Sequence, residues 1–310
     1  MAAKGSSSVF NLKNSVHLGG NDHLYHIGLL QTDDLETRFH DIKYVCMGGK
    51  ADRMKEFAEY MYVKLGKPEN CEFETVNGTK VLRDVGKSAG RYSFFKVGPV
   101  VSVSHGIGTA SLSVVLHEVL KLLYYAKCKN DVEFFRVGTS GGLGLEPGTI
   151  VITKQSYDSQ LFPLFSQVHC GEVVKLECRT DEKLRNALQD AANRAKVPVL
   201  IGNTMSTDDF FEGQARTDGA FCDYSEEDKI NFLRKAHDEH GIKNIEMESL
   251  CFTAMCTRAN VKCAVACVTV VNRLEHDDVT ADGSLLQTWQ ENLYKMMAEY
   301  IEWHEKISTK

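Results

Sequence analysis

Short apolar runs that end at glycine and lead into amphipathic stretches recur along this chain, and this alternation constrains its fold more than any other feature. The run Ile42–Met47 is followed by two glycines and then by a segment whose apolar residues recur at helical spacing. The same order returns at Val100–His105, where the glycine-bearing loop HGIG leads into a predicted helix over Thr109–Lys127. Strands that are buried on both faces read as apolar runs of this kind, and helices connect them. The alternation therefore predicts an α/β fold with a largely covered sheet.

The rest of the chain continues this pattern without an internal repeat or a long linker. Residues 1–20 are small, polar and aperiodic, so we expect a loose arm there and a single domain over residues 21–310. Further strands are predicted at Arg91–Val97, Thr149–Thr153, Pro198–Thr204 and Lys262–Asn272, and a strand followed by a loop at Glu133–Gly144. Further helices are predicted at Asp181–Lys196, Glu226–His240 and Asp282–Lys306.

Composition excludes several classes of function. The formal net charge of −6 argues against binding to nucleic acid or to an anionic membrane surface. No apolar run is long enough to cross a bilayer and no secretion signal is visible, so we expect a cytoplasmic protein. The ten cysteines form no CxxC pair and are interpreted mostly as reduced core residues. The histidines are scattered and HExxH is absent, so no metal site is predicted.

The segment EFFRVGTSGGLG, at Glu133–Gly144, contains the clearest candidate for ligand binding. Arg136 stands inside an apolar strand, where an unpaired guanidinium would be costly, and it therefore requires an anion. A turn with Thr139, Ser140 and several glycines, including Gly141, follows it and could offer backbone N–H groups to phosphate. The alternative is that Arg136 pairs with an internal carboxylate. No Walker-type lysine follows, and the spacing is not the dinucleotide pattern GxGxxG.

Two further segments carry weaker signals. Arg53 follows Gly49 near the start of a predicted helix, where the helix dipole disfavours a cation, so either a bound anion explains it or it is an ordinary solvated arginine. His26 lies in a half-apolar segment ahead of the first strong strand, and a solvent-facing or structural histidine is the commoner outcome there.

The segment STDDFFEGQARTDG combines aromatic, polar and glycine residues. Phe210 offers an aromatic face, and Gln214 and Arg216 offer donors, which together suit a flat heterocycle with carbonyl edges; core and surface positions are the alternative. In NIEMES, Glu246 and Glu248 flank Met247. On an extended segment the two carboxylates would point the same way and could bind a diol, whereas otherwise they are acids at a helix N-terminus.

Together these segments resemble the nucleoside phosphorylase family, most closely its uridine phosphorylases. The resemblance is carried in register by GGKADRM, HGIG, RVGTSGG, DDFFEGQARTDG and NIEMES, and it extends from about His26 to the closing helix. It implies a single-domain α/β fold of the nucleoside phosphorylase type, with a mixed, twisted and partly barrel-like central sheet flanked by helices. It also implies a pentosyltransferase that converts uridine and phosphate to uracil and ribose 1-phosphate in pyrimidine salvage, with phosphate as co-substrate and no cofactor.

The resemblance assigns roles position by position. It places Gly49, Arg53, Arg91, Arg136 and Thr139 on phosphate, His26, Glu246, Met247 and Glu248 at the ribose, and Phe210, Gln214, Arg216 and Gly141 at the base. The residues that act in catalysis are then Arg136, Gln214, Arg216 and Glu248. Arg91 and His26 match family residues that cross from a neighbouring subunit, so the resemblance implies a homo-oligomer, at least a dimer, with shared active sites.

Other functions remain open at this stage. They are a purine nucleoside phosphorylase, a hydrolytic nucleosidase, a non-catalytic nucleoside-binding homologue and, from the strand-glycine-helix units alone, a dinucleotide-dependent oxidoreductase. The first is disfavoured because purine-type relatives use an acid at the base, where this chain has Gln214 and Arg216.

Overall fold

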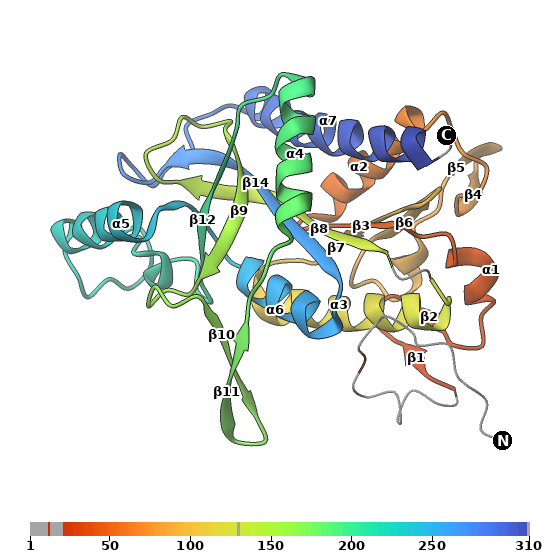
Figure 1. Ribbon diagram of the computed structural model, residues 1–310, viewed down its shortest axis with the longest axis horizontal. Coiled ribbons are helices and arrows are strands. Elements are labelled where there is room, and N and C mark those ends of the chain that lie inside the picture. The colour runs from red at the N-terminus through yellow and green to blue at the C-terminus, as the bar shows by residue number, and fades with distance from the viewer. Residues whose placement is uncertain (1–11, 13–20, 129–130, 309–310) are drawn as a thin grey trace.

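A mixed eight-stranded sheet forms the centre of the computed structural model, which describes residues 12, 21–128 and 131–308 (Figure 1). The predicted arm of residues 1–20 lies almost entirely outside the described residues, so the proposed division into arm and domain stays a prediction. Across the sheet the strands run in the order β13 (Ile242–Glu246), β12 (Val199–Ser206), β9 (Ile150–Tyr157), β14 (Lys262–Asn272), β8 (Glu133–Gly142), β3 (Tyr44–Gly48), β7 (Val100–Ser104) and β6 (Phe94–Val97).

An additional pairing closes part of this sheet into a barrel. β13 pairs with β12 in parallel and with β8 in antiparallel fashion, so the five strands from β13 to β8 return on themselves. β14 runs parallel to β8 and antiparallel to β9, which makes the sheet mixed. This confirms the expected fold: an α/β sheet that is partly barrel-like.

Helices cover the sheet in two groups. α2 (Ala51–Lys64), α4 (Glu182–Ala195) and α7 (Gly283–Ser308) gather at the top in Figure 1, and α3 (Gly108–Tyr125) and α6 (Ser249–Ala259) at the bottom. Each group packs its apolar side into a core cluster of its own. α5 (Glu226–His240) lies to one side, beside β13.

Short elements complete the chain around this frame. They are β1 (His23–Leu24), β2 (Leu29–Leu30), α1 (Leu35–Phe39), β4 (Phe73–Val76), β5 (Thr79–Leu82), η1 (Val85–Ser88), η2 (Glu212–Gln214) and the hairpin of β10 (Leu164–His169) and β11 (Glu172–Glu177). The hairpin projects away from the body of the molecule (Figure 1).

The predicted strands and helices are present, with ends shifted by a few residues, but one local prediction was wrong. Thr139–Gly142 is not a turn. It continues β8, because Thr139 and Ser140 align with Val268 and Thr269 of β14, and Gly141 aligns with Ile245 of β13. The glycines therefore lie in a strand that is paired on both sides.

Two negative findings concern the described residues only. None of the helices in them is both long and apolar enough to span a membrane. Nor do their histidine, cysteine and acidic side chains gather into a group of three that could hold a metal ion.

Candidate active site

A cavity of about 690 Å³ opens where several strands end, and it brings most of the predicted residues together. Its wall comes from the β3–α2 loop, from β8, from the junction between β13 and α6, from the loop after β12, from the end of β14 and from α7. The predicted site residues that line it are Gly49, Arg53, Arg91, Arg136, Thr139, Gly141, Phe210, Gln214, Arg216, Glu246, Met247 and Glu248. Only His26 among the predicted residues is absent from this wall.

Arg136 lies at the centre of the cavity, in β8, and is 3% exposed. Its Nη2 donates to the carboxylates of Glu248 and, at 2.9 Å, of Glu246, while Nη1 donates to Cys267 Sγ at 2.8 Å. The internal carboxylate considered from the sequence is therefore present. Arg136 Nε is buried and makes no hydrogen bond among the described residues. Burial by itself would lower the pKa of Arg136, but Cys267 and the two carboxylates outweigh it and raise that pKa.

Glu246 and Glu248 have different hydrogen-bond partners and different roles. Glu246 accepts hydrogen bonds from the N–H groups of Ser249 and Glu248 at 3.0 Å and so holds the start of α6. Glu248 accepts from the N–H of Gly108 at 2.7 Å and pairs with Arg136. Burial raises the pKa of Glu246, whereas for Glu248 the charge of Arg136 overcomes burial and lowers the pKa to about 2. Glu248 is therefore a carboxylate throughout the physiological range.

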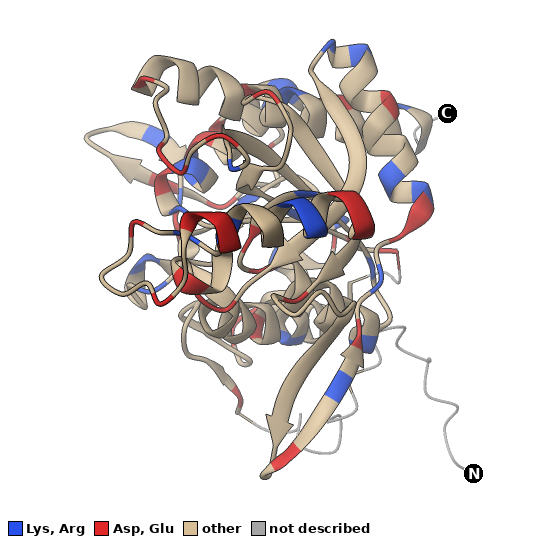
Figure 2. Cartoon of the chain, turned by 90° about the vertical axis from the view of Figure 1, so that its left-hand side faces the viewer, with Lys and Arg blue, Asp and Glu red and all other residues tan. Residues whose placement is uncertain are grey.

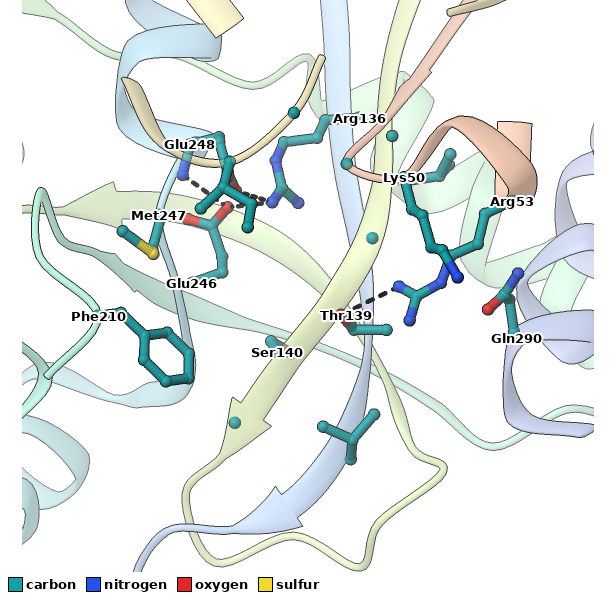
Figure 3. Close-up of a pocket in the computed structure, with 18 of the residues that line it drawn as sticks. Lys50, Arg53, Arg136, Thr139, Ser140, Phe210, Glu246, Met247, Glu248 and Gln290 are labelled. Carbon is teal, nitrogen blue, oxygen red and sulfur yellow. Dashed lines mark hydrogen bonds and ion pairs between the residues drawn. The ribbon is translucent and has the colours of Figure 1, made fainter. Parts of the chain in front are cut away.

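One end of the cavity is cationic and open to an anion. Arg53, in the first turn of α2, donates to Thr139 Oγ1 at 3.4 Å. Lys50 and Gln290 lie beside it, as Figure 3 shows, and neither was predicted from the sequence. Gln290 comes from α7, far along the chain, so no local pattern marked it. Gly49 is the residue after β3, and a Cβ there would lie 3.2 Å from the carbonyl oxygen of Gly106.

The opposite end combines an aromatic ring with buried donors. Phe210 is 45% exposed, and the guanidinium of Arg216 lies 4.7 Å from the centre of its ring. Gln214 is buried, and its Oε1 accepts from Arg273 Nη1 at 3.4 Å. Arg273 was missed in the sequence, although an arginine directly after the apolar strand Lys262–Asn272 was a usable signal. Gly141 leaves room for it, since a Cβ there would lie 2.7 Å from Arg273 Cγ.

His105 is fully buried near the central arginine. Neither of its ring nitrogens has a hydrogen-bond partner among the described residues. Burial and the nearby positive charge of Arg136 lower its pKa to about 4, so the imidazole is neutral at physiological pH.

The two residues expected to act across a subunit interface lie at different places. Arg91 is exposed and lines the cavity of its own chain. His26 lies away from that cavity: its Nδ1 is 2.6 Å from Glu118 Oε1, and Glu118 also accepts from the backbone N–H groups of His26 and Ile27. Their roles in a neighbouring site stay predictions.

The cavity thus offers three chemical environments in one space. A cationic end with a hydroxyl suits an anion, a carboxylate at the centre suits neighbouring hydroxyl groups, and an aromatic face with amide and guanidinium donors suits a flat heterocycle. Such an arrangement can hold an anion and a nucleoside side by side.

Comparison with known proteins agrees with this geometry. The family model described as "Phosphorylase superfamily" matches residues 43–302. Uridine phosphorylase 2 of Mus musculus is 42% identical over 286 residues, which cover 91% of this chain and 85% of that protein. The uridine and thymidine phosphorylase of Caenorhabditis elegans is 38% identical over 283 residues, or 90% of each chain. A solved uridine phosphorylase structure from the oomycete Phytophthora capsici aligns with a TM-score of 0.87 and 35% identity, covering 98% of this chain and 100% of that one.

Proposed function

This chain belongs to the phosphorylase superfamily, and from that premise we propose that it is a uridine phosphorylase, a pentosyltransferase that converts uridine and phosphate reversibly to uracil and ribose 1-phosphate. The observation that carries the proposal is that one cavity has both an anion end and a heterocycle end, on either side of Arg136 and Glu248.

Each part of the cavity takes one part of the two substrates. Phosphate is bound by Gly49, Arg53, Arg91, Arg136 and Thr139. The ribose is bound by Met247 and Glu248, with Glu246 next to them. The base is bound by Phe210, Gln214, Arg216 and Gly141. Lys50 adds a further cation at the phosphate end.

The chemistry follows from how charge moves as the glycosidic bond breaks. Positive charge grows on the sugar, where an adjacent phosphate and the ionised Glu248 stabilise it. Negative charge grows on the departing uracil, where Gln214 and Arg216 donate, and one preorganised donor of this kind typically contributes about 10²- to 10³-fold in rate. Holding phosphate and nucleoside together removes orientational entropy from the barrier. No carboxylate pair on opposite sides of the bond is needed, which separates this chemistry from that of ordinary glycosidases.

A nucleoside panel with and without phosphate tests the proposal. The purified protein is incubated with uridine, inosine and cytidine, and release of the free base is followed by absorbance. We expect uracil release from uridine that depends on phosphate. Release without phosphate would instead identify a hydrolytic nucleosidase, preference for inosine a purine nucleoside phosphorylase, and tight uridine binding without turnover a non-catalytic homologue.

Thymidine belongs in the same panel because of one relative. The Caenorhabditis elegans protein is named for both uridine and thymidine. We propose uridine as the main substrate of this chain, with thymidine as the second pyrimidine nucleoside to measure.

The cellular setting is part of the proposal. A reducing compartment such as the cytoplasm is supported by the ten cysteines, all of which are free and most of which are buried. The reaction would serve pyrimidine salvage and uridine breakdown. The enzyme would act as a homodimer or a larger ring, because His26 and Arg91 match family residues that come from a neighbouring subunit, and His26 lies away from the cavity of its own chain.

A further inference from the structure

A buried chain of charges leads from the base end of the cavity to helix α5. Arg273 is 1% exposed, and its Nε donates to Asp277 Oδ1 at 2.5 Å. The other oxygen of Asp277 accepts from Lys229 Nζ at 2.8 Å, and Lys229 is itself only 4% exposed. Asp277 and Lys229 do not line the cavity.

The remaining donors of Arg273 are directed at Gln214. Nη2 donates to the backbone carbonyl of Gln214 at 2.9 Å, and Nη1 donates to its side-chain Oε1 at 3.4 Å. A flipped amide would turn its NH₂ group toward the N–H of Arg273 Nη1, from which it could accept nothing. Arg273 therefore fixes which side of the Gln214 amide is the acceptor side.

From these contacts we propose that Asp277 and Lys229 are positioning residues for recognition of the pyrimidine base: they hold Arg273 so that it fixes the amide of Gln214. This inference rests on the proposed function, in which Gln214 contacts the base. It concerns two residues outside the cavity, on the loop after β14 and on α5.

Burial limits which partners the charged side chains of Arg273, Asp277 and Lys229 can have. A buried guanidinium or ammonium is costly without a partner, and Asp277 is the buried carboxylate that serves both Arg273 and Lys229. Lys229 has a second partner in Glu226, whose side chain is 61% exposed and therefore well screened. The backbone carbonyl of Asp277 also accepts from Arg216 Nη2 at 3.3 Å, so the same residue touches both arginines of the base end.

Helix α5 provides a matched control for Lys229. The helix faces the viewer in Figure 2, where its outer surface carries basic and acidic residues. Lys235 is an exposed lysine of this helix, whereas Lys229 is turned inward. Lys229→Met and Lys235→Met remove the same charge from the same helix, and only the first removes a partner of Asp277.

The decisive experiment compares uridine with cytidine in Asp277→Asn, Lys229→Met and Lys235→Met. The bases of these two nucleosides differ at ring nitrogen 3, which donates a hydrogen bond in uracil and accepts one in cytosine. The preference between them therefore reports the orientation of the Gln214 amide. For Asp277→Asn we expect kcat/KM for uridine to fall about tenfold or more, and the uridine preference over cytidine to fall with it, because a buried hydrogen-bonding group loses its partner. Lys229→Met should shift the preference in the same direction by a smaller factor, and Asp277→Glu should restore part of it.

Two further measurements distinguish a role in positioning Arg273 and Gln214 from a general loss of structure. The KM for phosphate should stay within about twofold of wild type in every variant, since among the described residues no hydrogen bond or ion pair joins Arg273, Asp277 or Lys229 to Arg53 or Gln290 at the anion end. Calorimetric binding of uracil and cytosine gives the same comparison without turnover, and it decides the inference even if the wild-type enzyme proves not to be a phosphorylase. An unchanged base preference in both Asp277→Asn and Lys229→Met would overturn the inference, as would equal effects of Lys229→Met and Lys235→Met.

Discussion

Arg136 is bound by three side chains at once, and this arrangement defines what a substitution there would do. A lysine keeps the positive charge but replaces the planar fork with a single ammonium, which cannot serve Glu248, Glu246 and Cys267 together. We therefore expect Arg136→Lys to raise the KM for phosphate at least tenfold and to lower kcat. Arg136→Ala should do the same more severely, but it also leaves two buried carboxylates without their cation, at a cost of about 3–5 kcal/mol in stability.

Steady-state kinetics with each substrate varied in turn measure the effect of Arg136→Lys. Arg234→Lys, on the exposed surface of α5, is the control for the same chemical change. If the phosphate KM of Arg136→Lys equals that of the control, Arg136 does not belong to the phosphate site.

At the level of single residues, the sequence identified candidate site residues better than it identified the side chains that they contact. It marked Arg136 and the pair Glu246 and Glu248, yet left open whether these acids cap a helix or face the site. Both happen, because Glu246 holds α6 while Glu248 turns to Arg136. Arg273 and Gln290 reach the cavity through tertiary packing of segments distant in sequence, which no local spacing encodes.

His105 makes a prediction about pH. Its pKa in the folded protein is lowered to about 4, first by burial and then by the charge of Arg136, against about 6.5 in an unfolded chain. Below pH 6.5 the unfolded chain therefore binds a proton that the folded protein does not. The contribution of neutral His105 to the free energy of unfolding is therefore fully present above pH 6.5 and is lost as the pH falls toward 4, by about 3 kcal/mol in all.

Urea unfolding between pH 4 and 8 measures this loss. His105→Leu removes a ring whose nitrogens have no hydrogen-bond partner in the part of the chain that the structure describes, and it should flatten the profile below pH 6.5. His40→Leu, at an exposed position, retains His105 and should therefore retain the slope. Equal slopes for wild type and His105→Leu would show that other groups cause the acid sensitivity.

At the level of elements, strand β8 serves both ends of the cavity through its glycines. A Cβ at Gly138 would lie 2.8 Å from Arg136 Nη1, and one at Gly141 would lie 2.7 Å from Arg273 Cγ. We expect Gly138→Ala to raise mainly the KM for phosphate and Gly141→Ala to raise mainly the KM for uridine, each severalfold, because both arginines are buried and cannot move freely.

The control for these two variants is Gly283→Ala, at the start of α7, where a Cβ would meet no atom of the described residues within 4 Å. It should leave both constants unchanged. Parallel rises of the two constants in Gly138→Ala and Gly141→Ala would mean that β8 acts as one unit rather than as two separate supports.

The elements themselves were largely predictable, and β8 shows where prediction stopped. Apolar periodicity located the strands and helices because burial in a covered sheet imposes that pattern. The run of glycines after Arg136 resembled a turn in isolation. Pairing with β14 and β13 on both sides keeps it extended, and those strands lie more than one hundred residues further along the chain.

At the level of the whole molecule, the position of His26 supports the proposal of a site shared between subunits, whereas Arg91 already lines the cavity of its own chain. The Nδ1 atom of His26 lies 2.6 Å from Glu118 Oε1, so Nε2 is the ring nitrogen that can reach another partner, and His26 is absent from the wall of its own cavity. Arg91 is exposed at the cavity of its own chain. We expect a monomer produced by dilution to be inactive, which gel filtration combined with an activity assay can measure.

Mixed dimers test the sharing directly. His26→Ala and Gln214→Ala each impair every site of their own homodimer. If His26 serves the neighbouring chain, a hybrid of the two variants contains one site with both residues intact, because Gln214 comes from the first chain and His26 from the second. Random mixing of subunits then restores about a quarter of the wild-type activity, since about half of the dimers are hybrids and each has one working site. If His26 instead served its own chain, both sites of every hybrid would lack one residue, and mixing would restore nothing.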